Sequence, residues 1–114
     1  MTTFLLNAFP NSLLVPEIIG HRKIVKRISE LTVKSFLRNG YVSAIGHDST
    51  ANVLSVRLGI EVKKARINVA PVDGDILIIA AFTPPRRLEE GELFTEEEIL
   101  NFDLAFCRIL WGES

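Results

Sequence analysis

Hydrophobic and polar positions alternate along the chain in patterns that separate short strands from short helices. Residues 2–6 are β-branched and apolar and precede the turn-forming Asn7, so they predict a first strand that ends near this residue. Residues 21–28 place successive side chains on two sides, which predicts a half-exposed strand. Residues 31–38 carry apolar side chains at helical spacing before Asn39-Gly40, and they predict a short amphipathic helix.

The start of a second predicted helix follows His47. Residues 48–50 each offer a side-chain oxygen that can cap a helix. Apolar side chains then recur at helical spacing over residues 51–58, and Gly59 closes the run. His47 is therefore predicted to lie just ahead of a helix N-terminus.

A hairpin is the next predicted element. Residues 66–71 and 75–82 flank Val72-Asp73-Gly74, which is a strong turn signal between two strands. The continuous apolar run over residues 76–82 is typical of a strand that is covered on both sides. It predicts the middle of the sheet.

The C-terminal segment reads as a loop, a short helix and a last strand. Pro84-Pro85 has no N–H to give to a sheet, so residues 86–91 are predicted as a loop. Residues 95–98 have the pattern of a helix capping box, and residues 104–111 alternate enough for a strand. The order of elements predicts a single α/β domain over residues 1–114, with a mixed sheet of about five strands and about three to four helices packed mainly against it.

Composition narrows the class of protein. Apolar residues make up 47% and charged residues 24% of the chain, which is typical of a folded soluble protein. The longest apolar run is far shorter than the ~20 residues of a membrane helix, and no secretory signal is visible, so we expect no membrane partner. Cys107 cannot form an internal disulfide, and with His21 and His47 it makes a poor ligand set for zinc. We expect no metal, no cofactor and a reducing cytoplasmic setting.

Charge is distributed unevenly. Residues 1–66 carry ten of the 13 Lys and Arg but four of the 14 Asp and Glu, whereas residues 67–114 carry three and ten. This asymmetry can mark an anion-binding face, or two halves that complement each other within the fold or across a dimer. The basic segment 21–28 has no aromatic residue for stacking on bases, so it predicts an edge strand protected by charge and no obligatory long nucleic acid.

Candidate chemistry begins at His47. Histidine titrates near pH ~6.5 when unperturbed, so it can donate or accept a proton at physiological pH. The backbone N–H groups at the start of the following helix, around Ser49, favour an anion in front of them. Gly46 and His47 can thus meet a phosphate. The alternative is a helix-capping turn with a surface histidine.

Three arginines form a second candidate group. Arg66, Arg86 and Arg87 have planar guanidinium groups that grip phosphate oxygens in a bidentate way. Arg87 and Glu90 lie three residues apart, so one can clamp a phosphate while the other orients a hydroxyl or accepts its proton. A solvated charge cluster is the alternative. Asn7 is either a ligand contact at a strand end or a plain turn residue.

Three segments together resemble one known family. They are Leu6-Asn7-Ala8, Ser43-Ala44-Ile45-Gly46-His47-Asp48-Ser49-Thr50 and Arg87-Leu88-Glu89-Glu90-Gly91. They look like the viral ring nucleases that act as type III anti-CRISPR proteins, a family found mostly in archaeal viruses and mobile elements. The resemblance covers nearly the whole chain. One departure is Pro84-Pro85-Arg86, where the family often has an amide such as Gln before the loop arginine.

The resemblance implies a metal-independent phosphodiesterase, a hydrolase that forms a homodimer around one cyclic tetra-adenylate. It implies His47, Arg87 and Glu90 as catalytic residues. The predicted substrate contacts are Asn7, Gly46, Ser49, Arg66 and Arg86. Two cuts would leave linear di-adenylates with 2′,3′-cyclic phosphate ends and so suppress type III CRISPR immunity in the host cytoplasm. The alternative function is a non-catalytic dimer that binds nucleic acid or a host factor.

Overall fold

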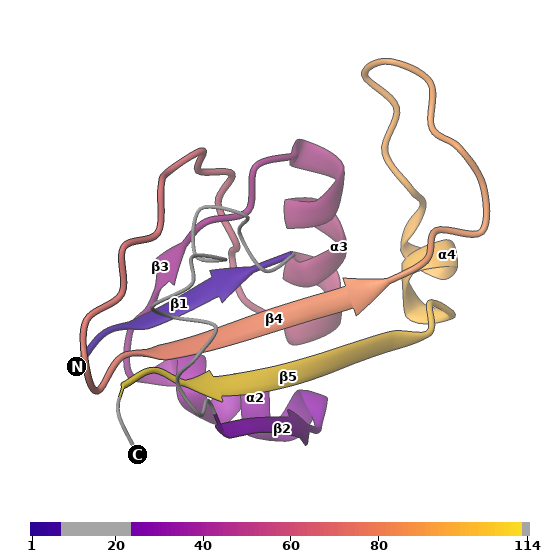
Figure 1. The fold of residues 1–114 in the computed structure, drawn as a ribbon. Coiled ribbons are helices and arrows are strands. Elements are labelled where there is room, and N and C mark those ends of the chain that lie inside the picture. Colours follow the sequence, from indigo (N-terminus) through magenta and orange to yellow (C-terminus); the bar gives the residue numbers. More distant parts are fainter. Residues whose placement is uncertain (8–23, 113–114) are drawn as a thin grey trace.

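The sheet of the computed structural model has five strands in the order β2-β5-β4-β1-β3 (Figure 1). The structure describes residues 1–7 and 24–112. The strands are β1 (Thr3–Leu6), β2 (Ile24–Ile28), β3 (Val42–Ser43), β4 (Ile76–Phe82) and β5 (Leu104–Leu110). The helices in the described residues are α2 (Glu30–Arg38), α3 (Asp48–Leu58) and α4 (Glu96–Leu100). The predicted α/β class with a mixed sheet is confirmed.

Strand β4 is the centre of the sheet, as its apolar sequence predicts. It pairs with β1 in parallel, with Leu6 opposite Ile79, and with β5 in antiparallel, with Phe82 opposite Leu104. Strand β1 also pairs with β3 in parallel. Strands β1, β3 and β4 therefore point the same way, and their carboxyl ends meet at one edge of the sheet.

The predicted hairpin between residues 66–71 and 75–82 is wrong. Both edges of β4 are occupied, by β1 and by β5, so no edge is left for residues 66–71. The turn itself is present: the Asp75 N–H donates to the Val72 carbonyl at 3.0 Å, and Gly74 has a φ of 94°. The turn directs the chain into β4 from outside the sheet. The short strand β3 was not predicted.

Helices α2 and α3 pack against one face of the sheet (Figure 1). The shared core contains Val33 and Leu37 of α2, Leu54 and Leu58 of α3, and Leu5, Ile78 and Phe106 of the strands. Each such side chain contributes about 1.5–3 kcal/mol when it leaves water. This packing fixes the position of α3, and with it the position of its first turn.

Helix α4 packs mainly against α3, in a cluster that also takes in Phe82 at the end of β4. Phe94, Ile99 and Phe102 form a separate cluster with Val53 of α3. Arg57 of α3 reinforces this contact, because its Nη1 donates to the carbonyl of Phe102 at 2.6 Å. The prediction that helices pack mainly against the sheet therefore holds for α2 and α3, while α4 extends the core sideways.

The remaining predicted elements agree with the structure. Strand β2 covers residues 24–28 of the predicted 21–28, and residues 21–23 lie outside the described residues. The capping box of α4 is present: the Thr95 hydroxyl accepts the Glu98 N–H at 3.2 Å, and the Glu98 carboxylate accepts the Thr95 N–H at 3.0 Å. Among the described helices, none is long and apolar enough to cross a membrane.

Candidate functional site

Three parallel strands end at the edge of the sheet where the candidate residues gather. Asn7 follows β1, His47 follows β3 after a short connection, and residues 83–95 form the loop after β4. Ligands of α/β proteins bind beyond the carboxyl ends of parallel strands. The topology thus brings to one edge three segments that are far apart in the sequence (Figure 1).

A short buried connection delivers His47 from β3 to the start of α3. The Ala44 N–H donates to the Leu5 carbonyl at 2.9 Å, and the Ala65 N–H donates to the Ile45 carbonyl at 2.7 Å. Ile45 is completely buried. The chain is therefore fixed on both sides just before His47, which is itself exposed.

His47 is the N-cap of α3. Its backbone is extended, with a φ of −130° and a ψ of 139°, and its side chain makes no capping hydrogen bond. The predicted cap among residues 48–50 is wrong, because the helix already begins at Asp48. The predicted position of His47 just ahead of the helix is confirmed. The first N–H groups of an α-helix have no acceptor within the helix, and the helix dipole there favours negative charge.

Residues 61–66 run parallel to the chain that leads from β3 to His47, and they form one wall of the site. The Tyr41 hydroxyl donates to the Glu61 carbonyl at 3.0 Å, and the Ser43 hydroxyl donates to the Lys63 carbonyl at 2.6 Å. Burial, and then the Glu61 carboxylate, raise the pKa of Tyr41, which favours the protonated hydroxyl that donates to the Glu61 carbonyl. These contacts hold residues 61–66 alongside the approach to α3.

This wall is cationic. The Arg66 Nε donates to the Gly46 carbonyl at 3.0 Å, which places the guanidinium next to His47. The Lys64 Nζ lies 3.6 Å from the Asp48 Oδ2 at the first turn of α3. Arg66 therefore stands next to His47, and Lys64 is paired with Asp48 at the positive end of the helix dipole.

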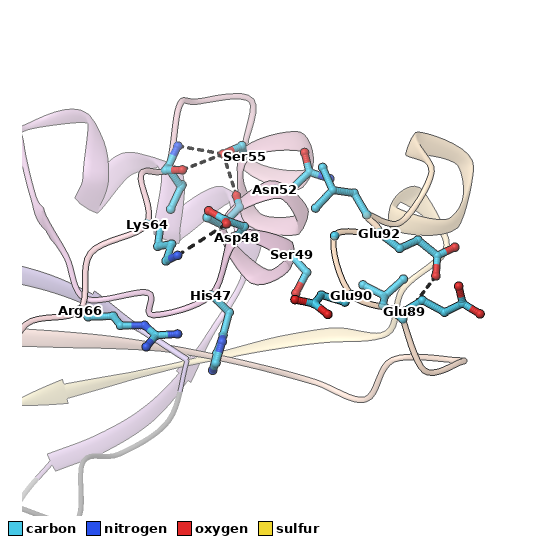
Figure 2. Close-up of a pocket in the computed structure, with 15 residues that line it drawn as sticks. His47, Asp48, Ser49, Asn52, Ser55, Lys64, Arg66, Glu89, Glu90 and Glu92 are labelled. Atoms are coloured by element: carbon cyan, nitrogen blue, oxygen red, sulfur yellow. Dashed lines mark hydrogen bonds and ion pairs between the residues drawn. The ribbon is translucent and has the colours of Figure 1, made fainter.

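A pocket of about 850 Å³ separates this wall from the loop after β4 (Figure 2). Figure 2 shows His47, Lys64 and Arg66 on one side of it, with Glu89, Glu90 and Glu92 of the loop on the other. A second pocket, of about 500 Å³, is lined by Gly46, His47 and Arg66 together with residues 67–68. His47 and Arg66 thus stand between two adjoining hollows.

The structure distributes the predicted site residues unequally. His47, Ser49, Arg66 and Glu90 all line the larger pocket, and Gly46 lines the smaller one. Asn7 and Arg87 are exposed and line neither. The guanidinium of Arg86 is occupied by the carboxylates of Glu92 and Glu98. The roles assigned to these residues stay predictions.

Several pocket residues were not singled out from the sequence. They are Asn52, Ser55, Lys64, Glu89 and Glu92. Helical spacing could have found Asn52, because residues three apart share a face of α3 with Ser49. No local signal could have found Lys64, because it reaches the pocket through the pairing of residues 61–66 beside β3.

The side chains that could hold a metal ion are dispersed in the described part of the chain. Within residues 1–7 and 24–112, no group of three or more His, Cys, Asp and Glu side chains is arranged to hold a metal ion. The chemistry available at this site is that of an imidazole, a helix N-terminus, two cations and four carboxylates around one pocket. Such a set suits a phosphate ester whose own hydroxyl group lies nearby.

Comparison with known proteins shows relatives in archaeal viruses. Residues 3–106 match the STIV B116-like family. The chain is 35% identical over 101 residues to ORF116 of Acidianus filamentous virus 1, a match that covers 87% of this chain and 83% of that one. It is 34% identical over 105 residues to ORF117 of Acidianus two-tailed virus, with 86% and 88% covered. The fold matches B116 of Sulfolobus turreted icosahedral virus with a TM-score of 0.75 and 28% identity, over 97% of this chain and all of that one.

Proposed function

The chain belongs to the STIV B116-like family, and from that premise we propose that it is a metal-independent ring nuclease that opens cyclic tetra-adenylate. The main support is the position of His47. His47 stands at the N-cap of α3, beside the Arg66 guanidinium and at the mouth of a pocket large enough for a nucleotide. An acid–base group, a cation and oriented N–H dipoles thus converge on one volume. Phosphodiester cleavage requires groups of these kinds, which transfer protons and stabilise negative charge.

The substrate supplies its own nucleophile. In cyclic tetra-adenylate each phosphodiester has a neighbouring 2′-hydroxyl, whose oxygen forms a bond to phosphorus while the bond from phosphorus to the 5′-oxygen breaks. The hydroxyl loses its proton to a base, and the leaving 5′-oxygen takes a proton from an acid. The products are a 2′,3′-cyclic phosphate and a free 5′-hydroxyl. The protein therefore has only to align the 2′-hydroxyl with the phosphorus, neutralise the charge on the phosphate and transfer protons.

The predicted site residues divide these tasks. Protonated His47 gives its proton to the leaving 5′-oxygen, and general acid catalysis of this kind contributes roughly 10²- to 10⁴-fold. The first turn of α3 and Arg87 stabilise the charge that gathers on the phosphate, with Arg66 and Ser49 as further contacts. Glu90 accepts the proton of the 2′-hydroxyl or orients that group from the opposite wall.

A homodimer completes the proposal. A ring of four nucleotides contains a twofold axis, so a symmetric dimer presents two identical sites to opposite linkages. Two cuts give two linear di-adenylates. Loss of the messenger in the host cytoplasm would then suppress type III CRISPR immunity.

The test uses labelled cyclic tetra-adenylate and the purified protein in excess EDTA. We expect linear di-adenylates with 2′,3′-cyclic phosphate ends, and in His47→Ala a rate lower by roughly 10²- to 10⁴-fold. Lys63→Ala is the matched control, because Lys63 is an exposed cation near the site whose side chain does not line the pocket. An intact ring after incubation with the wild-type protein, or an undiminished rate in His47→Ala, contradicts the proposal.

The second candidate is a non-catalytic dimer that binds nucleic acid or a host factor. The cationic side chains of Lys63, Lys64 and Arg66 on one segment favour a polyanion among these partners. Such binding would weaken steeply with salt, and it would not change the cyclic ligand. Titration of the protein with duplex DNA and single-stranded RNA at two salt concentrations separates this candidate from the ring nuclease.

A further inference from the structure

The two adjacent arginines of the loop after β4 have different surroundings. Arg86 donates from Nε and Nη2 to the two carboxylate oxygens of Glu98, at 2.8 and 3.0 Å, and from Nη1 to Glu92 at 3.0 Å. Its guanidinium carbon also lies 5.4 Å from the centroid of the Phe94 ring. Arg87 is exposed and makes no hydrogen bond or ion pair with any of the described residues.

The carboxylates that hold Arg86 are themselves attached to backbone. The second oxygen of Glu92 accepts the N–H of Glu89 at 3.0 Å. Glu98 accepts the N–H of Thr95 at 3.0 Å within the capping box of α4. One guanidinium therefore joins the beginning of the loop to its end and to a helix that is packed against α3.

The segment between these attachments carries the predicted catalytic residues. Residues 87–91 lie between Arg86 and Glu92, so fixing those two ends restricts the conformations open to Arg87 and Glu90. A single exposed ion pair contributes little, but a bidentate arginine in a network of several charges is the exception to that rule. Holding catalytic groups in place before the substrate arrives lowers the entropic cost of reaction.

We propose that Arg86 is a positioning residue, which holds the loop against α4 so that Glu90 faces the pocket at the start of α3 and the conformations open to Arg87 are restricted. This inference rests on the proposed function, because it assigns a role in the same site. It differs from the prediction of Arg86 as a substrate contact. A phosphate that bound Arg86 would have to displace two carboxylates that already occupy three of its donors, whereas Arg87 has no such competitor among the described residues.

The first experiment needs no substrate. Hydrogen exchange of the free protein is compared in wild type, Arg86→Gln, Glu98→Gln and Arg87→Gln, with Arg38→Gln as an exposed control on α2. Exchange of the amides of residues 87–92 should rise several-fold in the first two variants and stay unchanged in the others. Glu98→Gln is informative because glutamine still serves the capping box while it loses the ionic bond.

The second experiment measures cleavage of cyclic tetra-adenylate by the same variants. Arg86→Gln and Glu98→Gln should each lower kcat/KM by roughly tenfold to a hundredfold, the loss expected from a misplaced catalytic group. Arg86→Lys should fall between wild type and Arg86→Gln. The double variant Arg86→Gln/Glu98→Gln should be no worse than Arg86→Gln alone, because Arg86→Gln already breaks the contact with Glu98.

The outcomes separate the two proposals. Unchanged loop exchange in both Arg86→Gln and Glu98→Gln overturns the positioning role, whatever the activity. Full activity in Glu98→Gln beside a loss in Arg86→Gln also overturns it, because that pattern belongs to a direct substrate contact. A wild-type protein that leaves the ring intact refutes the proposed function. Arg86 would then have no role in catalysis, even where hydrogen exchange shows that it holds the loop.

Discussion

A single carboxylate joins the beginnings of the neighbouring strands β1 and β4. Asp75 is 3% exposed, and its two oxygens accept the N–H of Thr2 at 2.8 Å and the N–H of Val72 at 2.9 Å. The side chain thus closes the turn before β4 and anchors the beginning of β1. A buried carboxylate with both oxygens occupied is a structural residue whose removal leaves donors without partners.

We therefore expect Asp75→Ala to lower the free energy of unfolding by about 1–3 kcal/mol. Equilibrium denaturation with urea measures this loss. Asp73→Ala is the control, because Asp73 lies in the same turn but is exposed. Equal stabilities of the two variants would show that the Asp75 contacts contribute nothing.

The sequence predicted His47 but not Asp75, and the reason is distance along the chain. His47 precedes a helix whose start and periodicity are local signals, so its place could be predicted from its neighbours. Asp75 is bonded to a residue 73 positions away, and no local pattern reports such a contact. Residue type alone grouped Arg86 and Arg87 as candidates for phosphate binding, since the carboxylates that distinguish them lie up to 12 residues away.

Among the elements, α3 ends as its sequence indicates. Gly59 is its C-cap with a φ of 67°, in the left-handed region that side chains other than glycine rarely adopt. A Cβ at this position would meet nothing within 4 Å, so the cost of a substitution is conformational only.

Gly59→Ala should lower the free energy of unfolding by about 1–2 kcal/mol, the cost of a left-handed backbone for an L-residue. Gly59→Asn should cost less, because asparagine tolerates this conformation better. Thermal melts of the three proteins check the order. A melting temperature of Gly59→Ala at or above that of wild type is the contrary result.

At the scale of the elements, the sequence did not predict which strands pair. Strand signals were right for β1, β4 and β5, because each has an apolar or alternating run of its own. Residues 66–71 also have such a run but form no strand, because β1 takes the edge of β4 that the turn seemed to offer. Which segments pair is decided across the whole chain, and two-residue β3 exists only because β1 provides its edge.

The attachment of α4 should depend on pH. Arg86, and then the N–H of Thr95, lower the pKa of Glu98 to about 2, and the N–H of Glu89 and Arg86 lower that of Glu92. A lowered pKa in the folded state means that the contact stabilises the fold above the ordinary pKa of 4.5 and that this contribution is lost as the pH falls toward 2.

Hydrogen exchange of the α4 amides, corrected for intrinsic rates, should therefore rise between pH 4.5 and the lowest pH at which the fold persists. The charged groups that interact with Glu98 are Arg86 and Glu92. Glu98→Gln cannot titrate, so its exchange should be raised at pH 7 and should change much less on acidification. Parallel pH profiles of variant and wild type would contradict this account.

At the scale of the whole molecule, the proposed dimer makes a stoichiometric prediction. Co-expression of wild type with His47→Ala, each with its own tag, yields mixed dimers that can be purified through both tags. Such dimers have one intact site and should cut one linkage, so linear tetra-adenylate should accumulate before any di-adenylate. Product analysis by mass spectrometry checks this order. Release of di-adenylate alone, or a monomer in sedimentation, would contradict the dimer.

The meeting of three strand ends at one edge of the sheet also has a consequence for biosynthesis. The pocket draws on residues from His47 to Leu93, and the loop on one side of it is attached through Glu98. A nascent chain that has exposed only β1, β3 and α3 has the histidine but no opposite wall. The proposed activity should thus arise late in translation, once α4 and β5 have left the ribosome, and would report complete folding.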